Sequence, residues 1–180
     1  MIATTAESPK SSWIAAGIHL ADETKAKLDE LSSEDLSFLE EQLAWKDHYA
    51  PELAHEAVEE YRKWIAIQVA VSDPLFSLSY FEGREHRPGM PSRHVDAAWH
   101  RHILFTREYQ DFCTRIAGRM IHHRPCTRQN ITSMDSRSSL RAYSVLFGEM
   151  PAIWRERAEF LTVPMSMCDG QGTGCETIRT

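Results

Sequence analysis

The sequence predicts an all-α protein, an irregular bundle of five or six helices. Apolar residues recur every three or four positions over several stretches, typical helix-starting residues precede these stretches, and no segment alternates like a strand. A chain of 180 residues, 42% of them hydrophobic, is long enough to bury one substantial core. We therefore expect a single helical domain at 19–163, a disordered N-terminus at 1–18 and a flexible Gly/Cys-rich tail at 164–180.

The first half of the chain predicts two or three helices. An acidic region from Leu20 to about Trp45 indicates one or two of them. Pro51 suits the first turn of a longer amphipathic helix that continues to about Val71. Asp73-Pro74 stops this helix, and the Gly/Pro/Arg-rich stretch 82–91 indicates a loop. The expected buried positions are Leu36, Leu39 and Leu43 in the first region, then Ala54, Val58, Tyr61, Ile65 and Gln68.

The second half predicts a pair of short helices followed by a broken segment. Ser92 is the expected N-cap of the first helix, which ends near Phe105, and Thr106 is the expected N-cap of the second, which ends near Gly118. The stretch 124–139 is polar and broken. Beyond it we expect a helix over Leu140, Tyr143, Leu146 and Phe147 that ends at Gly148, and a short helix from Pro151 through Phe160 that packs Ile153 and Trp154.

The segment 95–125 concentrates residues that can bind metals, with four histidines, Cys113 and Asp96 among apolar side chains. On the first helix, Asp96 and His100 are neighbours on one flank of the apolar stripe, and His102 lies on the other flank. The same helical phase places His94 on the solvent side. A carboxylate and an imidazole four residues apart can donate two metal ligands, or the aspartate can fix the tautomer of the histidine.

The second helix and its exit contribute the remaining candidates. Cys113 falls on the face that should enter the core. It is therefore interpreted either as a small buried side chain or as a metal ligand. A tight antiparallel hairpin would return the segment after Gly118 toward Asp96. The candidate metal ligands are therefore Asp96, His100, His102, Cys113, His122 and His123, and hydrogen-bonded imidazoles without a ligand are the alternative interpretation.

These motifs resemble a known family. The patterns V-D-x-x-W-H-x-H-x-L, T-x-x-Y-x-x-x-C and G-x-x-x-H-H-x-P, which lie between Val95 and Pro125, are similar to those of the glycine-rich domain-containing proteins. Members often carry an aspartate where this chain has Phe105. The resemblance implies a helical domain and supplies no reaction mechanism.

Charge is divided unevenly along the chain. The first 82 residues are strongly acidic, whereas 83–180 are basic and contain arginine but no lysine. Arginines such as Arg93, Arg101 and Arg115 could bind an anionic partner, but the net charge of −6 argues against a dedicated nucleic-acid binder. The sequence has no apolar run long enough for a membrane span, and it has no signal peptide. We therefore expect a cytoplasmic protein.

The sequence is consistent with three functions. The first is a metal-binding helical protein holding one transition metal, zinc, iron or copper, with oxygenase-like or hydrolytic chemistry on a small molecule or peptide. The second is a non-catalytic binding module that engages an anionic partner through its arginines. The third is a structural or regulatory protein without a ligand. Cys168 and Cys175, six residues apart in the tail, could form a redox pair, although a flexible end is the simpler interpretation.

Overall fold

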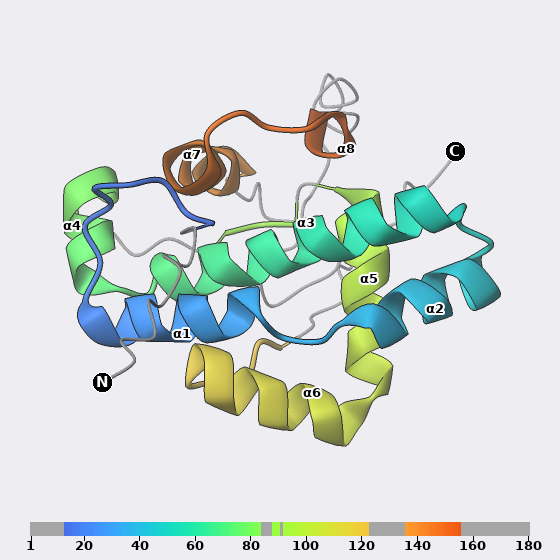
Figure 1. The fold of residues 1–180 in the computed structure, drawn as a ribbon. Helices are drawn as coiled ribbons and strands as arrows, with labels where there is room; N and C mark the ends of the chain where they lie inside the picture. Colours follow the sequence, from blue (N-terminus) through green and yellow to red (C-terminus); the bar gives the residue numbers. More distant parts are fainter. Residues whose placement is uncertain (1–12, 84–87, 91, 123–135, 156–180) are drawn as a thin grey trace, which may run out of the picture.

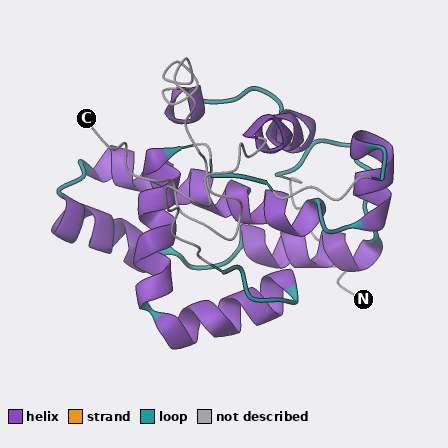
Figure 2. Ribbon diagram, turned by 180° about the vertical axis from the view of Figure 1, so that it is seen from behind, coloured by secondary structure: helices purple, strands orange, loops and turns teal. Residues whose placement is uncertain are grey.

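The computed structural model describes residues 13–83, 88–90, 92–122 and 136–155, and within these ranges it contains helices and no strands (Figure 1 and Figure 2). This confirms the all-α fold, although the described helices outnumber the five or six expected. None of them combines the length and the apolar character needed to cross a bilayer. The elements are α1 (Asp22–Ser32), α2 (Ser37–Asp47), α3 (Pro51–Ala70), α4 (Pro74–Phe81), α5 (Arg93–Leu104), α6 (Thr106–Phe112), the π-helical turn η1 (Cys113–Ala117), α7 (Ser136–Phe147) and α8 (Ala152–Arg155).

Helix α3 is the centre around which the other helices pack. It contacts α1, α2, α5 and α7, and Figure 1 shows α1 and α2 on one side of it and α7 and α8 on the other. The five apolar-face positions predicted for it are buried. From Glu60 to Ala70, however, every residue except Lys63 is buried, so this half of the helix is not amphipathic as the sequence suggests.

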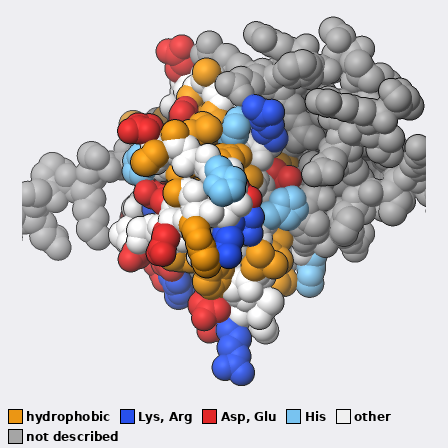
Figure 3. All heavy atoms as spheres, turned by 90° about the vertical axis from the view of Figure 1, so that its right-hand side faces the viewer, with side chains coloured by type: hydrophobic (Ala, Val, Ile, Leu, Met, Phe, Trp, Pro, Cys, Tyr) orange, Lys and Arg blue, Asp and Glu red, His pale blue; other side chains and the backbone are white. Residues whose placement is uncertain are grey.

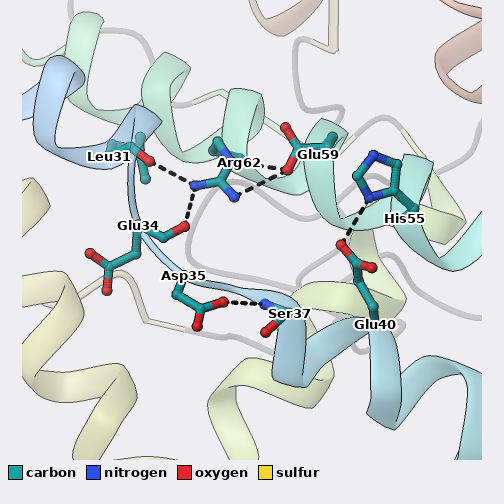
Figure 4. A network of polar contacts seen from close by, with 8 residues as sticks. All are labelled: Leu31, Glu34, Asp35, Ser37, Glu40, His55, Glu59 and Arg62. Atoms are coloured by element: carbon teal, nitrogen blue, oxygen red, sulfur yellow. Dashed lines mark hydrogen bonds and ion pairs between the residues drawn. The ribbon is translucent and has the colours of Figure 1, made fainter.

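The polar residues of α3 find their partners on the surrounding elements. The guanidinium of Arg62, 8% exposed, donates to the carbonyl oxygens of Leu31 (2.8 Å) and Glu34 (2.7 Å). It also donates to the Glu59 carboxylate, as Figure 4 shows. A single buried side chain thus fixes the α1–α2 connection against α3.

Helix α4 is the element that the sequence analysis missed. The carboxylate of Asp73 accepts hydrogen bonds from the backbone N–H groups of Leu75 (2.7 Å) and Phe76 (3.3 Å), and Pro74 occupies the first turn. The same carboxylate accepts from the N–H of Ala21 at 2.8 Å. Asp73-Pro74 therefore ends α3, as predicted, and also starts the next helix.

The two helices of the histidine-rich segment form where predicted, with one correction. Ser92 caps α5, because its hydroxyl accepts from the N–H groups of His94 and Val95. Thr106 is already the first residue of α6, so it is not the N-cap; Phe105 serves as the boundary residue of both helices. The indole of Trp99 packs on that of Trp64 with ring centroids 4.6 Å apart, which fixes α5 against α3.

The two ends of the described chain meet at α7. Helix α7 begins at Ser136, earlier than predicted, and ends before Gly148, whose φ of 80° favours glycine. Trp13 packs on Phe147 with centroids 5.4 Å apart. This contact holds Trp13, which lies within the stretch 1–18 that the sequence analysis expected to be disordered; the domain boundaries stay a prediction. Ile153 and Trp154 are buried as expected, while the predicted helix beyond 155 and the tail with Cys168 and Cys175 lie outside the described residues.

We expect Arg62→Met to lower the free energy of unfolding by about 1–3 kcal/mol, because the buried Leu31 carbonyl and the partly buried Glu34 carbonyl lose the guanidinium that donates to them. Urea denaturation followed by tryptophan fluorescence measures the change. Arg107→Met, at an exposed position of α6, is the matched control and should change the free energy by no more than about 0.5 kcal/mol. Equal effects of the two substitutions would contradict the anchoring role of Arg62.

Candidate functional site

Asp96 and His100 lie next to each other on α5, as the sequence predicts. The Oδ2 atom of Asp96 is 3.5 Å from Nδ1 of His100. The aspartate is buried, at 8% exposure, whereas 44% of the His100 side chain is exposed. Beside His100 is a cavity of about 350 Å³, lined by Asp47, Ala97, His100, Arg101 and Leu104. The pair thus combines a buried carboxylate with an imidazole that borders open space.

The loop between α2 and α3 covers one flank of this pair. His48 adopts a left-handed conformation (φ 57°) that ends α2, and the next residue, Tyr49, reaches back to α5. The Tyr49 hydroxyl is 3.0 Å from Nδ1 of His94, and the two rings meet edge to face. His94 is consequently 7% exposed, and its predicted solvent-side position is wrong because this loop covers that side of the helix.

The hydrogen bonds around His94 define its tautomer. Nε of Arg93 donates to Nε2 of His94 at 3.2 Å, so Nε2 must be the accepting nitrogen. Nδ1 then carries the hydrogen and donates to the Tyr49 oxygen. Burial raises the pKa of Tyr49, and the nearby carboxylates of Asp47 and Asp96 raise it further. Tyr49 therefore remains a neutral phenol whose own O–H can donate at this site.

An ion pair joins the end of α2 to α5 at the edge of the cavity. The guanidinium of Arg101 donates to both carboxylate oxygens of Asp47, with an Nε–Oδ2 distance of 2.7 Å. The hydrogen bond to Asp47 raises the pKa of Arg101. Figure 3 views this end of the molecule and shows histidine, basic and apolar side chains side by side on its surface. Arg115 is also paired, with Glu30 and Glu34, so two of the arginines considered for an anionic partner already bind carboxylates.

His102 has a different environment from His100, although the two are two residues apart. Its Nδ1 atom is 2.9 Å from the hydroxyl of Tyr61 on α3. Burial lowers the pKa of His102 to about 4, so the imidazole is neutral at physiological pH. The rings that surround it are Phe38, Tyr61, Tyr109 and Phe112. His102 is therefore part of the core.

The remaining candidate ligands do not join the pair within the described chain. Cys113 is fully buried, as expected, and burial raises the pKa of its thiol. His122 is exposed in the stretch after η1, and His123 lies outside the described residues. Among the residues that the structure describes, no three histidine, cysteine or acidic side chains form a group that could hold a metal. Asp96 and His100 are the part of the predicted set that the structure brings together.

Comparison with known proteins identifies a family. A family model described as UCP032817-like matches residues 38–157, two-thirds of the chain. The chain belongs to this family. It is an uncharacterised family, and the matched range contains both the Asp96–His100 pair and the loop with Tyr49. No curated protein and no solved structure matches the chain. The resemblance to glycine-rich domain-containing proteins remains a prediction.

Sequence reasoning missed Asp47 and Tyr49 as contributors to the site, and it considered Arg101 for an anionic partner instead of for Asp47. All depend on where the α2–α3 loop comes to lie, about fifty positions away from α5 along the chain. The His48-Tyr49 step before Ala50-Pro51 was the one local signal, because it separates two helical patterns and must hold a turn. That signal locates a turn, but it does not indicate that the turn packs against α5.

The burial of His102 predicts a pH-dependent stability. Its pKa is about 4 in the folded state and 6.5 when unperturbed, so between these values the unfolded chain binds the extra proton. The contribution is fully present above pH 6.5 and is lost as the pH falls toward 4. The total loss should be about 3 kcal/mol.

Urea denaturation at several pH values across this window measures the effect. His102→Gln keeps a hydrogen-bonding partner for Tyr61 and removes the titrating group, so its stability should depend less on pH in the same window. Parallel curves for the wild type and this variant would show that another group governs the acid sensitivity.

Proposed function

We propose that this protein binds a transition metal at the exposed edge of α5, with Asp96 and His100 as two of the ligands. The observation that carries the proposal is the 3.5 Å separation of their facing atoms. A charge-assisted hydrogen bond between such groups is shorter, about 2.7–2.9 Å. Two ligand atoms at about 2.0–2.2 Å from a tetrahedral ion are about 3.4 Å apart, which is close to the spacing found here.

The surroundings of the pair support this proposal. Asp96 is buried, which holds the carboxylate in place, whereas His100 faces the cavity of about 350 Å³. A metal held by two protein ligands on one side would keep coordination positions for water or substrate on the other. A small molecule or a peptide side chain fits a space of this size. Hydrolytic or oxygenase-like chemistry is consistent with such an open site.

The ligand set that we propose is smaller than the one suggested by the sequence. We leave out His102 and Cys113 because both belong to the core, and we retain one of His122 and His123 as the predicted third ligand. A site of carboxylate and imidazole without thiolate favours zinc or iron over copper(I). The alternative of an arginine surface for an anionic partner has less support, since Arg101 and Arg115 are paired with carboxylates.

The proposal predicts that untagged, chelator-treated protein binds about one equivalent of Zn²⁺ in isothermal titration calorimetry. His100→Ala and Asp96→Asn should each weaken this binding by about tenfold or more. His55→Ala is the matched control, because His55 is an exposed histidine that also contacts a carboxylate, Glu40, but at 2.9 Å.

The control should bind Zn²⁺ as the wild type does. Circular dichroism of each variant separates the loss of a ligand from the loss of the fold. Wild-type protein that binds neither Zn²⁺ nor Fe²⁺, or equal losses for His55→Ala and His100→Ala, would refute the proposal.

A further inference from the structure

A second cavity, of about 450 Å³, lies where α3, α7 and the α7–α8 connection meet. It contains none of the candidate metal ligands. Glu60 and Lys63 of α3 and Tyr143 of α7 form its polar floor, and Met150 and Pro151 contribute to an apolar wall. Figure 1 shows α7 and α8 on the side of α3 opposite to α1 and α2. The function proposed above does not involve this cavity.

The carboxylate of the floor is buried and well bonded. Glu60 is 4% exposed; its Oε2 atom accepts from the indole N–H of Trp154 at 2.7 Å, and its Oε1 atom accepts from Nζ of Lys63 at 2.6 Å. The phenol of Tyr143 lies near this carboxylate, and the pKa of Tyr143 is raised by burial first and by the Glu60 charge second. Glu60 is therefore an internal anchor that joins α3 to α7 and α8.

Lys63 differs from its neighbours on α3 because part of its side chain, 27%, remains exposed. Its ammonium donates to Glu60 and, at 3.2 Å, to the Tyr143 oxygen, and it lies 5.6 Å from the Tyr143 ring centroid. An ammonium has three N–H donors, and the described residues accept from two of them. The third N–H belongs to an ammonium that two contacts already hold in position, so it is preorganised to donate to a ligand.

We propose that this cavity binds a small organic carboxylate whose oxygen accepts from Lys63. The ligand's apolar part would pack on Met150, Pro151 and Ala152. The Glu60 carboxylate neutralises the charge of the Lys63 ammonium, but Glu60 is buried behind the lysine. The ammonium would therefore lie between two carboxylates, that of Glu60 and that of the ligand. Glu149, also on the lining, is exposed, and salt screens its repulsion. A cationic ligand is disfavoured, because the two groups that could attract it, the Glu60 carboxylate and the Tyr143 ring, already interact with the Lys63 ammonium.

The test uses benzoate with two relatives of the same ring, neutral benzamide and cationic benzylammonium. The indole N–H of Trp154 is a local reporter because it bonds to Glu60, and its resonance in ¹H–¹⁵N spectra is assigned with Trp154→Phe. Benzoate should shift this resonance in a saturable manner. Benzamide and benzylammonium should bind at least tenfold more weakly. The experiment is run with a chelator present, so its outcome is independent of metal binding.

Two variants locate the contact. Lys63→Met keeps the apolar stem, and we expect it to weaken benzoate binding at least tenfold. Lys46→Met, which removes an exposed ammonium over the Trp45 ring, should leave benzoate binding unchanged. The proposal is overturned if benzoate produces no saturable shift, if benzamide or benzylammonium binds as well, or if the two variants behave alike. The comparison of the three probes on the wild type decides the matter even if Lys63→Met does not fold.

Discussion

The structure depends on one constraint, that the half of α3 from Glu60 to Ala70, buried on nearly every side, must satisfy its polar side chains inside the protein. Over most of α3 water is excluded, so each polar group there requires a partner from a neighbouring element. These requirements determine which segments pack against the helix and in what register. The partners are the carbonyls of Leu31 and Glu34 for Arg62, His102 for Tyr61, the carbonyls of Gly89 and Pro88 for Trp64 and Gln68, and Trp154 for Glu60.

The orientation of the α5 site follows from the same constraint. Trp99 packs on Trp64, and His102 bonds to Tyr61, so two contacts with α3 fix the rotation of α5 about its axis. With that rotation fixed, Asp96 and His100 lie at the edge of the helix, next to the end of α2. The same segment thus contains a histidine that holds the helix in the core and a histidine that borders a cavity. Some histidines of a histidine-rich segment are therefore present because they pack in the core.

The parts that the sequence could predict are those that depend on neighbours within one helical turn. The Ser92 cap and the contact of Asp96 with His100 are of this kind, because helical spacing alone brings the groups together. The contact of Tyr49 with His94 could not be predicted, because it depends on where a distant loop lies. Helix α4 was missed for a local reason, since Asp73-Pro74 is both a stop and a start signal. The burial of Arg62 could not be predicted because its partners are distant in the sequence. A charged residue is expected at the surface unless such partners are known.

The segment Glu59–Lys63 shows how consecutive polar residues of one helix take on separate roles. Successive side chains are about 100° apart, so they point to different surroundings. Arg62 meets the α1–α2 connection, Tyr61 meets α5, and Glu60 meets α7 and α8. Each of these three would leave a buried group without a partner if it were replaced. Lys63 stands apart, because Trp154 also bonds the Glu60 carboxylate and because the Lys63 side chain borders open space. Its ammonium therefore both pairs with the buried Glu60 carboxylate and faces the cavity in which we propose that a carboxylate binds.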